Sequence, residues 1–270
     1  MLTFLFWNVN GKPVEAAVTR MAKANGVDVL VLAECSIAPS KLLNDLNRNE
    51  AKSFELPFSQ CPRIAIYTRF ESKHLVALRE SDHFTIRRLK LPRSEAILLV
   101  AAHLPSKLHV NRESEPFRLE RFARKIRQVE SEAGHTRTIV IGDLNANPYE
   151  AGLLAASGLN GAMTREIASR KTRTIDGEEY PFFFNPMWGM FGDGTKAPPG
   201  TYYYARAEDV TPFWNMYDQV LLRPDLLHRF DTSSVKILSA AGGVPLVGKK
   251  GHPRSSVFSD HLPIVFQIDL

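Results

Sequence analysis

Short runs typical of β-strands recur along the whole chain, and they restrict its fold more than any other feature of the sequence. They occupy residues 2–7, 27–33, 64–68, 96–102, 138–141, 217–222, 235–239 and 264–268. Several of these runs do not alternate apolar with polar residues, as a strand with one solvated face does. The sequence therefore predicts β-strands that are covered on both faces.

Two segments between the runs have helical spacing. Residues 13–25 begin with a proline, end before a glycine and carry apolar side chains on one face, which is typical of a helix. Residues 115–132 form a second, longer pattern of this kind. Its apolar positions are Leu119, Phe122, Ile126 and Val129, and its basic ones are Arg118, Arg121, Arg124, Lys125 and Arg127. We expect helices in both segments.

The 270 residues show no internal repeat, no low-complexity tract and no linker rich in Gly, Ser or Pro. This length fits one large domain, so we assign residues 1–270 to a single domain. Residues 175–214 are rich in aromatic residues, Gly and Pro. We expect long loops there, with one short strand at 201–204.

The composition argues against several classes of protein. The hydrophobic fraction is 44 % and the charged fraction 23 %, and no run approaches the roughly 18 apolar residues that span a bilayer. We therefore expect no membrane partner. Two cysteines, Cys35 and Cys61, are too few for a disulfide scaffold and favour the cytoplasm, although they can still pair. The net charge of +5 weakly supports a polyanionic partner.

Polar side chains stand at one end of six apolar segments. They are Asn8 with Asn10, Glu34, His103, Asp143 with Asn145, Asp218, and Asp260 with His261. Each alone is compatible with a turn, a helix cap or an interior hydrogen bond. A carboxylate beside a buried strand costs free energy unless it is paired or binds a metal. Six such positions in one chain indicate a shared site.

The motifs around these positions resemble those of the endonuclease/exonuclease/phosphatase superfamily, which includes DNase I-like and exonuclease III-like enzymes. They are Phe6-Trp-Asn-Val-Asn-Gly11, Leu32-Ala-Glu-Cys35, Ala102-His-Leu-Pro105, Ile141-Gly-Asp-Leu-Asn-Ala-Asn-Pro148, Tyr217-Asp-Gln-Val-Leu221 and Ser259-Asp-His-Leu-Pro-Ile264. They span nearly the whole chain. The resemblance implies an α+β fold, a four-layer α/β/β/α sandwich of two mixed β-sheets flanked by helices.

Hydrolysis of a phosphodiester needs charge neutralisation, an activated water and a stabilised leaving oxygen. Mg²⁺ prefers hard oxygen ligands and keeps several waters, so one or two carboxylates suffice. Glu34 is our first choice as a metal ligand, with Asn8 beside it and Asp260 as a further ligand. We expect Mg²⁺ as the cofactor, with Mn²⁺ able to substitute. Zinc is disfavoured because no Cys/His cluster has its spacing.

His261 is the best candidate for the general base, because an unperturbed histidine has a pKa of about 6.5. The resemblance gives Asp218 the role of orienting its ring. Asp143 then positions the attacking water or protonates the leaving oxygen, and Asn145 donates to the charge on phosphorus. His103 donates to a phosphate oxygen or serves as a second acid. The sequence does not separate the roles of these last three residues.

Two departures from well-known branches of the superfamily bear on the substrate. A histidine, His103, stands where abasic-site repair endonucleases generally have tyrosine. Met216-Tyr-Asp218 replaces their Arg-Ile/Leu-Asp signature, and the signature of inositol polyphosphate phosphatases is missing. Abasic-site repair and inositol polyphosphate dephosphorylation are therefore less favoured as activities of this chain. Basic residues near the last motif, Lys249, Lys250 and Arg254, are expected to bind substrate together with Asn10.

These features predict a nuclease that acts on DNA or RNA. The alternative is a phosphatase or phosphodiesterase with the same machinery, acting on a small phosphorylated metabolite or a lipid headgroup. A non-catalytic nucleic-acid-binding module is a third reading, which the presence of Glu34, Asp143 and His261 disfavours. The sequence specifies no oligomeric state.

Overall fold

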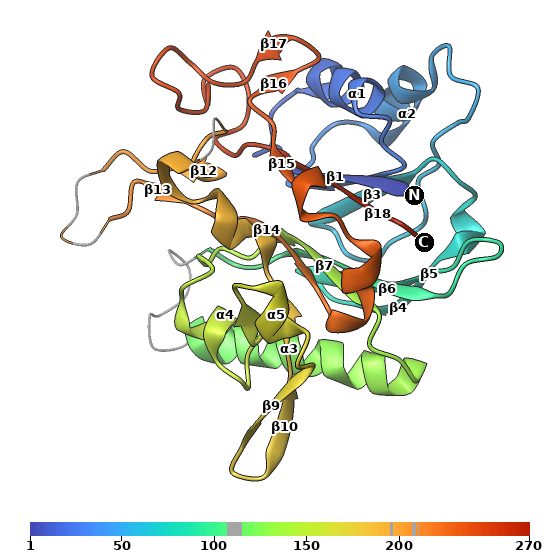
Figure 1. Cartoon of the computed structure of the whole chain (residues 1–270). Coiled ribbons are helices and arrows are strands. Elements are labelled where there is room, and N and C mark those ends of the chain that lie inside the picture. The colour runs from blue at the N-terminus through green and yellow to red at the C-terminus, as the bar shows by residue number, and fades with distance from the viewer. Residues whose placement is uncertain (107–114, 195–196, 207–208, 210) are drawn as a thin grey trace.

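Two β-sheets packed face to face form the centre of the computed structural model, which describes residues 1–106, 115–194, 197–206, 209 and 211–270 (Figure 1). The first sheet has the order β15 (Lys236–Ile237), β18 (Ile264–Ile268), β1 (Leu2–Asn8), β2 (Val29–Ala33), β3 (Ile64–Thr68). The second has the order β4 (Leu75–Glu80), β5 (Phe84–Leu89), β6 (Ile97–His103), β7 (Thr138–Asp143), β14 (Asp218–Leu222), β11 (Phe183–Phe184), β8 (Gly161–Ala162). Both sheets are mixed, since β1 is parallel to β2 and β6 to β7 among antiparallel neighbours.

Helices cover the outer faces of both sheets. On the side of the first sheet lie α1 (Glu15–Ala24) and α2 (Pro39–Asn47), and on the side of the second lie α3 (Glu115–Ala133), α4 (Ala151–Leu154) and α5 (Arg165–Ala168) (Figure 1). Val18 and Met21 of α1 are buried, as are Phe122 and Ile126 of α3. The predicted four-layer α/β/β/α sandwich of two mixed sheets is confirmed.

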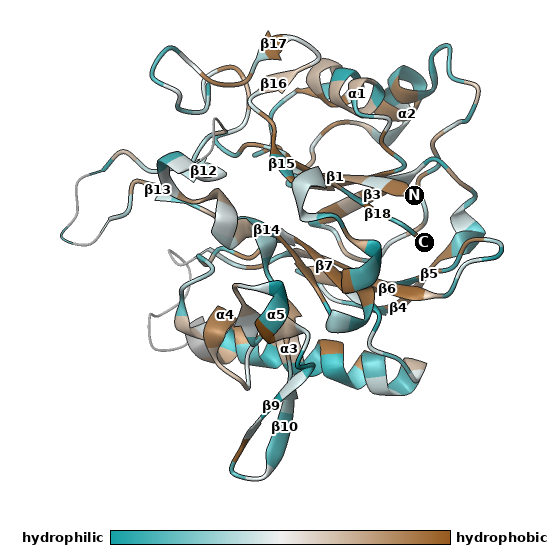
Figure 2. Ribbon diagram, viewed as in Figure 1, coloured by the Kyte–Doolittle hydropathy of each residue, from teal (hydrophilic) through white to brown (hydrophobic). Residues whose placement is uncertain are grey.

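The central strands of the second sheet are continuously apolar because both faces of this sheet are buried. In β6, Leu98 and Val100 face the core under α3, whereas Leu99 and Ala101 face the core between the sheets. Successive side chains of a strand point to opposite faces, so a strand between two cores needs apolar residues at every position. Figure 2 shows these central strands in brown.

The remaining elements are small. Two-stranded ribbons are formed by β9 (Thr172–Ile175) with β10 (Glu178–Pro181), β12 (Tyr202–Tyr203) with β13 (Trp214–Asn215), and β16 (Ala240–Ala241) with β17 (Val244–Pro245). Short 3₁₀ helices are η1 (Ser72–His74), η4 (Pro186–Met190), η5 (Gly192–Gly194), η6 (Pro224–Arg229) and η7 (Thr232–Ser234). The expectation of one strand in residues 175–214 was wrong, because this segment also contains β10, β11 and β13. Of these, β10 carries no apolar run and is teal in Figure 2.

Both cysteines are free: Cys61 is buried and Cys35 is partly exposed. No helix in the described part of the chain combines the length and apolar character needed to cross a membrane. The two helices expected at residues 13–25 and 115–132 are α1 and α3, with ends that differ by one or two residues.

A buried ion pair joins α3 to the second sheet. Arg223, just after β14, donates from Nε and Nη2 to the two carboxylate oxygens of Glu130 at 2.8 and 2.9 Å. Its Nη1 also donates to the carbonyl oxygens of Pro181 and Phe182 at 2.7 and 3.1 Å. Its guanidinium carbon lies 3.8 Å from the ring centroid of Phe183. The side chains of Arg223 and Glu130 are only 2 % and 4 % exposed, so neither charge can be rehydrated if its partner is lost.

We predict that Glu130→Ala lowers the free energy of unfolding by about 3–5 kcal/mol, because it leaves an uncompensated buried guanidinium. Urea denaturation followed by circular dichroism measures this loss. The matched control is Glu132→Ala on the same helix: Glu132 is 54 % exposed and pairs with Arg79, so its loss should be below about 1 kcal/mol. Equal losses from the two variants would contradict the prediction.

Candidate active site

Three polar side chains form a row across the second sheet. His103 at the end of β6 pairs with Asp143 at the end of β7, and Asp143 pairs with Asp218 at the start of β14. Residues in register on neighbouring strands point to the same face. In β6 and β7 this face is the one on which Ala101 and Ile141 enter the core between the sheets. The inter-sheet core therefore ends in a polar row at this edge.

Gly142 allows the strands that carry this row to approach. A Cβ built on Gly142 would lie 2.0 Å from the carbonyl oxygen of Ala102, which no side chain can occupy. Beyond this contact, the backbone N–H of Leu104 donates to the carbonyl oxygen of Asp143 at 2.9 Å. The glycine before Asp143 therefore keeps the ends of β6 and β7 together and fixes Asp143 beside His103.

The first sheet contributes Asn8, at the end of β1, and Glu34, just after β2. Asn8 Nδ2 donates to Glu34 Oε1 at 3.1 Å and to Asp143 Oδ2 at 3.0 Å. His103 Nε2 lies 3.2 Å from the same Glu34 oxygen. Glu34 has a φ of +50°, which is unusual for a residue with a side chain and costs about 1–3 kcal/mol. The N–H of Gly11 donates to its carbonyl oxygen at 2.9 Å and stabilises this conformation.

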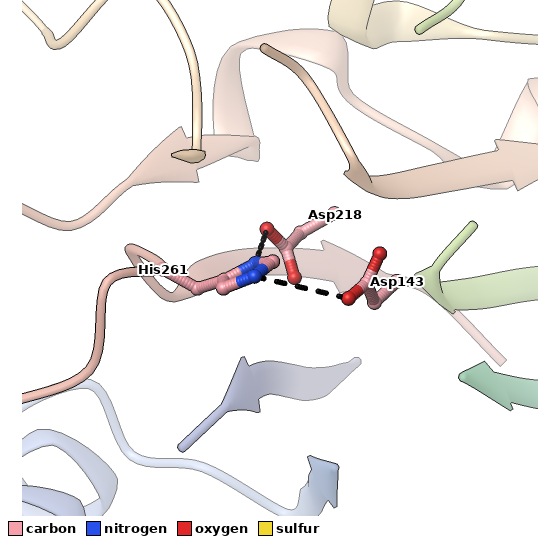
Figure 3. A group of neighbouring side chains, drawn as sticks. All are labelled: Asp143, Asp218 and His261. Carbon is pink, nitrogen blue, oxygen red and sulfur yellow. Dashed lines mark hydrogen bonds and ion pairs between the residues drawn. The ribbon is translucent and has the colours of Figure 1, made fainter. Parts of the chain in front are cut away.

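His261 contacts both aspartates through its two ring nitrogens, and Figure 3 marks each contact with a dashed line. Its Nδ1 is 2.8 Å from Asp218 Oδ2, and its Nε2 is 3.9 Å from Asp143 Oδ2. The ring centroid is 4.8 Å from that of Tyr202. Because Nδ1 bonds to Asp218, Nε2 is the ring nitrogen that remains available to a substrate, a water or a ligand.

The loop that carries His261 is fixed to β1. Ser259 Oγ donates to the carbonyl oxygen of Asn8 at 2.6 Å and accepts from the N–H of His261 at 3.0 Å. Trp7 Nε1 donates to the carbonyl oxygen of His261 at 2.8 Å. Neither Trp7 nor Ser259 was among the predicted site residues, although both lie within the quoted motifs. The sequence does not show which side chain fixes a loop.

Burial and neighbouring charges set the protonation of this cluster. Burial lowers the pKa of His261, but attraction to Asp218 and Asp143 raises it more, to about 10. Burial raises the pKa of the Asp143 carboxyl, which outweighs its attraction to His261. Burial lowers the pKa of His103. These residues by themselves therefore hold His261 as an imidazolium, and His103 as a neutral imidazole, at neutral pH.

The donor set fits a divalent cation. Asp143, Asp218 and His261 are buried and each offers a ligand atom, all within 4.8 Å of one another. Asp218 Oδ1 is buried and accepts no hydrogen bond from any residue that the structure describes. Two carboxylates and an imidazole next to Glu34 are the kind of ligands that divalent cations take. A metal ion would satisfy charges that the protein alone leaves only partly compensated.

Asn10, Asp260 and Asn145 border the cluster. Asn10 Nδ2 donates to Asp260 Oδ1 at 2.8 Å, which joins the loop after β1 to the loop before β18. The N–H of Asn145 donates to Asp143 Oδ1 at 2.9 Å, and its Nδ2 donates to the carbonyl oxygen of Leu104 at 2.8 Å. Asn145 thus holds the Asp143 carboxylate from the side opposite Asn8 Nδ2.

The three predicted basic residues, Lys249, Lys250 and Arg254, line a cavity of about 350 Å³ on the loop of residues 248–257. Lys249 and Lys250 are exposed and form no ion pair with any described residue. Arg254 donates from Nη1 to the carbonyl oxygen of Pro245 at 3.1 Å, and its guanidinium lies 5.5 Å from the ring centroid of Phe258. The described contacts do not join these cations to the acid–imidazole cluster.

The residues of this cluster lie within a match to a known protein family. The sequence model of the Endonuclease/Exonuclease/phosphatase family matches residues 5–261. The chain belongs to this family. The match includes every polar residue of the row and of the loops around it. The chain is thus a phosphodiesterase of the Endonuclease/Exonuclease/phosphatase family, and its buried Asp–Asp–His group is consistent with a divalent metal site. No curated protein sequence matches it.

Solved structures of the Endonuclease/Exonuclease/phosphatase family share the fold along the whole chain. A 3′ phosphatase, NExo from Neisseria, bound to a product DNA hairpin, aligns with a TM-score of 0.60 at 14 % identity, over 100 % of both chains. An AP endonuclease from Archaeoglobus fulgidus aligns with 0.58 at 15 %, also over 100 % of both. The human Nocturnin catalytic domain with bound sulfate aligns with 0.55 at 16 %, over 99 % of this chain and 94 % of that one. At these identities the likeness shows the fold.

We predict that Asp218→Asn lowers the pKa of His261 well below 10, because the largest attraction that holds its proton is removed. Titration of the ring protons by nuclear magnetic resonance in chelator measures the change. Asp269→Asn is the control, since Asp269 is an exposed partner of the N-terminal ammonium. An unchanged pKa of His261 in Asp218→Asn would show that this pair does not set its protonation.

Proposed function

We propose that this phosphodiesterase is a magnesium-dependent nuclease acting on DNA or RNA, with His261 as the general base. The observation that carries the proposal is the placement of His261 between Asp218, 2.8 Å from Nδ1, and Asp143, 3.9 Å from Nε2. One carboxylate is in contact with the ring, and the other leaves space beside Nε2. A base that activates water needs this asymmetry.

Glu34, with Asn8 beside it and Asp260 nearby, is proposed to hold the metal ion together with the buried carboxylates. Their oxygens are the hard ligands that Mg²⁺ prefers, and Mn²⁺ accepts the same set. A divalent cation held by these residues would neutralise charge on the phosphate. By repelling the imidazolium, it would also lower the pKa of His261 and so favour the unprotonated ring.

The remaining roles follow from the protein's own residues. Asp218 accepts a hydrogen bond from the Nδ1–H of His261, which leaves Nε2 to take a proton from the attacking water. The raised pKa of Asp143 suits either of its two roles, positioning that water or protonating the leaving oxygen. His103, neutral at pH 7, donates from Nε2 to a phosphate oxygen. Asn145, which bonds to Asp143, donates to the charge that develops on phosphorus.

Two observations support a nucleic acid as the substrate. The chain carries a net charge of +5, and the exposed Lys249 and Lys250 are free to contact phosphates. We propose that these lysines, Arg254 and Asn10 bind the strand on one side of the cleaved bond. The two free cysteines support our placement of the protein in the cytoplasm. The same machinery acting on a small phosphoester is the second candidate.

We predict that the purified protein cleaves at least one of plasmid DNA, single-stranded DNA and RNA with Mg²⁺ or Mn²⁺, and that EDTA abolishes cleavage. His261→Ala should lower kcat by roughly 10³-fold or more, because it removes the base. His228→Ala, at an exposed position in η6, is the control and should keep full activity. A panel of phosphorylated metabolites runs in parallel. If only that panel is turned over, the second candidate replaces the nuclease.

We predict that Glu34→Gln weakens the binding of Mn²⁺ at least tenfold, because an amide oxygen is a poorer ligand than a carboxylate. Isothermal titration calorimetry measures the affinity directly, without a substrate. Glu71→Gln is the control, because Glu71 is 62 % exposed and pairs with Lys73. Equal affinities of the two variants would remove Glu34 from the metal site.

A further inference from the structure

A cavity of about 660 Å³ lies next to the catalytic cluster but on the other face of the second sheet, under α3. Its walls come from the β4–β5 hairpin at residues 79–84, from Leu104 and Pro105 after β6, and from one face of α3. None of the residues to which we have given a catalytic or metal-binding role lines it. The cavity therefore needs an explanation of its own.

The floor of this cavity is apolar and aromatic. Leu104 and Phe122 are buried, and Phe84 packs beside them. The ring centroids of Phe84 and Phe122 are 5.2 Å apart, with the planes tilted by 58°. Phe84 is only partly buried, so its ring is an aromatic surface at the base of the cavity on which a flat ring can stack, with Phe122 packed behind it.

The rim of the cavity is strongly basic. Arg121, Arg124 and Lys125, which we call the α3 cation row, are exposed and form no ion pair with any described residue. Positive charges three and four residues apart on a helix repel one another. A surface of this kind is complementary to a chain of negative charges.

The acid in the cavity wall does not neutralise the α3 cation row. Glu80 Oε1 accepts from the guanidinium of Arg87 at 2.8 Å and from Ser59 Oγ at 2.6 Å. Its other oxygen accepts from the N–H of Gln60 at 2.8 Å. The carboxylate is committed to these groups, so the field at the rim remains positive.

The cavity shares a wall with the catalytic cluster. Leu104 follows His103 directly, and its backbone N–H and carbonyl bond to Asp143 and Asn145 on the catalytic side. On the cavity side, His83 Nδ1 lies 3.2 Å from the carbonyl oxygen of His103. Among the described residues, the backbone of residues 103–105 thus belongs both to the catalytic cluster and to the wall of the cavity.

We propose that this cavity binds a nucleotide of single-stranded nucleic acid beyond the cleaved bond, with its base on Phe84 and its phosphates on the α3 cation row. The inference rests on the proposed nuclease function and adds the form of the substrate. A paired and stacked base in a duplex cannot enter the cavity, whereas an unpaired base can. Flanking phosphates then lie within reach of the row.

The test removes the α3 cation row without changing the helix. Arg121→Gln, Arg124→Gln and Lys125→Gln are combined in one variant, because Gln is a good helix former. Its matched control combines Arg20→Gln, Lys52→Gln and Lys236→Gln, three exposed cations outside the cavity that pair with no described residue. Both variants lose three positive charges, so any difference between them reports position rather than net charge.

Fluorescence anisotropy in EDTA measures affinity for single strands of about 4 and about 12 nucleotides, a range that covers known single-strand site sizes. We expect the longer strand to bind the control more tightly than the shorter one, and the cation-row variant to lose that gain by tenfold or more. The slope of log affinity against log salt should be shallower by about 2 in this variant, for three lost phosphate contacts.

Phe84→Leu tests the base contact, because it keeps the floor apolar but removes the aromatic ring. We expect weaker binding of a strand with bases and unchanged binding of a matched abasic strand. An equal effect on both strands would overturn the assignment of the floor to a base. Hydrolysis of bis(p-nitrophenyl) phosphate at the wild-type rate in all variants shows that the catalytic cluster is intact.

Three further results separate the proposals. Equal strand affinities of the cation-row variant and its control overturn the role of the cavity, while strand cleavage by both leaves the nuclease function standing. Loss of binding to vesicles with phosphatidylserine, with strand affinity unchanged, assigns the row to a membrane surface and also overturns the inference. Failure of the unmodified protein to cleave any strand overturns the nuclease function itself.

Discussion

The register of three neighbouring strands is the constraint on which the site depends. The pairing of β6, β7 and β14 puts His103, Asp143 and Asp218 side by side, and one residue of slip would turn any of them toward α3. Gly142 fixes the closest point of that pairing. Catalysis is thus supported by the backbone of the sheet, which is more rigid than a loop.

The first sheet completes the site by meeting this row across the core. Asn8 bonds to Glu34 in its own sheet and to Asp143 in the other, so one amide connects both layers. The carboxylates around it repel one another, and the fold tolerates them because imidazole, amide and N–H groups surround them. Such a cluster is costly without a cation and stable with one. The electrostatic arrangement is therefore suited to binding metal as well as to chemistry.

The sequence predicted the layers and the convergence of polar residues better than it predicted the details. Each apolar run, and the acid at its end, lies within one short stretch of sequence and can be recognised there without knowledge of the fold. The hairpin β9–β10 and the short helix α2 were not foreseen, since neither carries a distinctive apolar run. The supporting bonds of Ser259 and Trp7 could not be foreseen either, because a hydrogen bond across some 250 residues leaves no local signal.

The long sequence separation between β1 and the loop that carries His261 affects the order in which the site forms during synthesis. The carboxylates of β2, β7 and β14 are all synthesised before the loop that carries His261, which reaches β1 only when β18 pairs with it. Contacts of such high sequence separation form late in folding. A growing chain that has been synthesised as far as β14 therefore holds Glu34, Asp143 and Asp218 but not His261, so the Asp–Asp–His group is complete only once the last strand is in place.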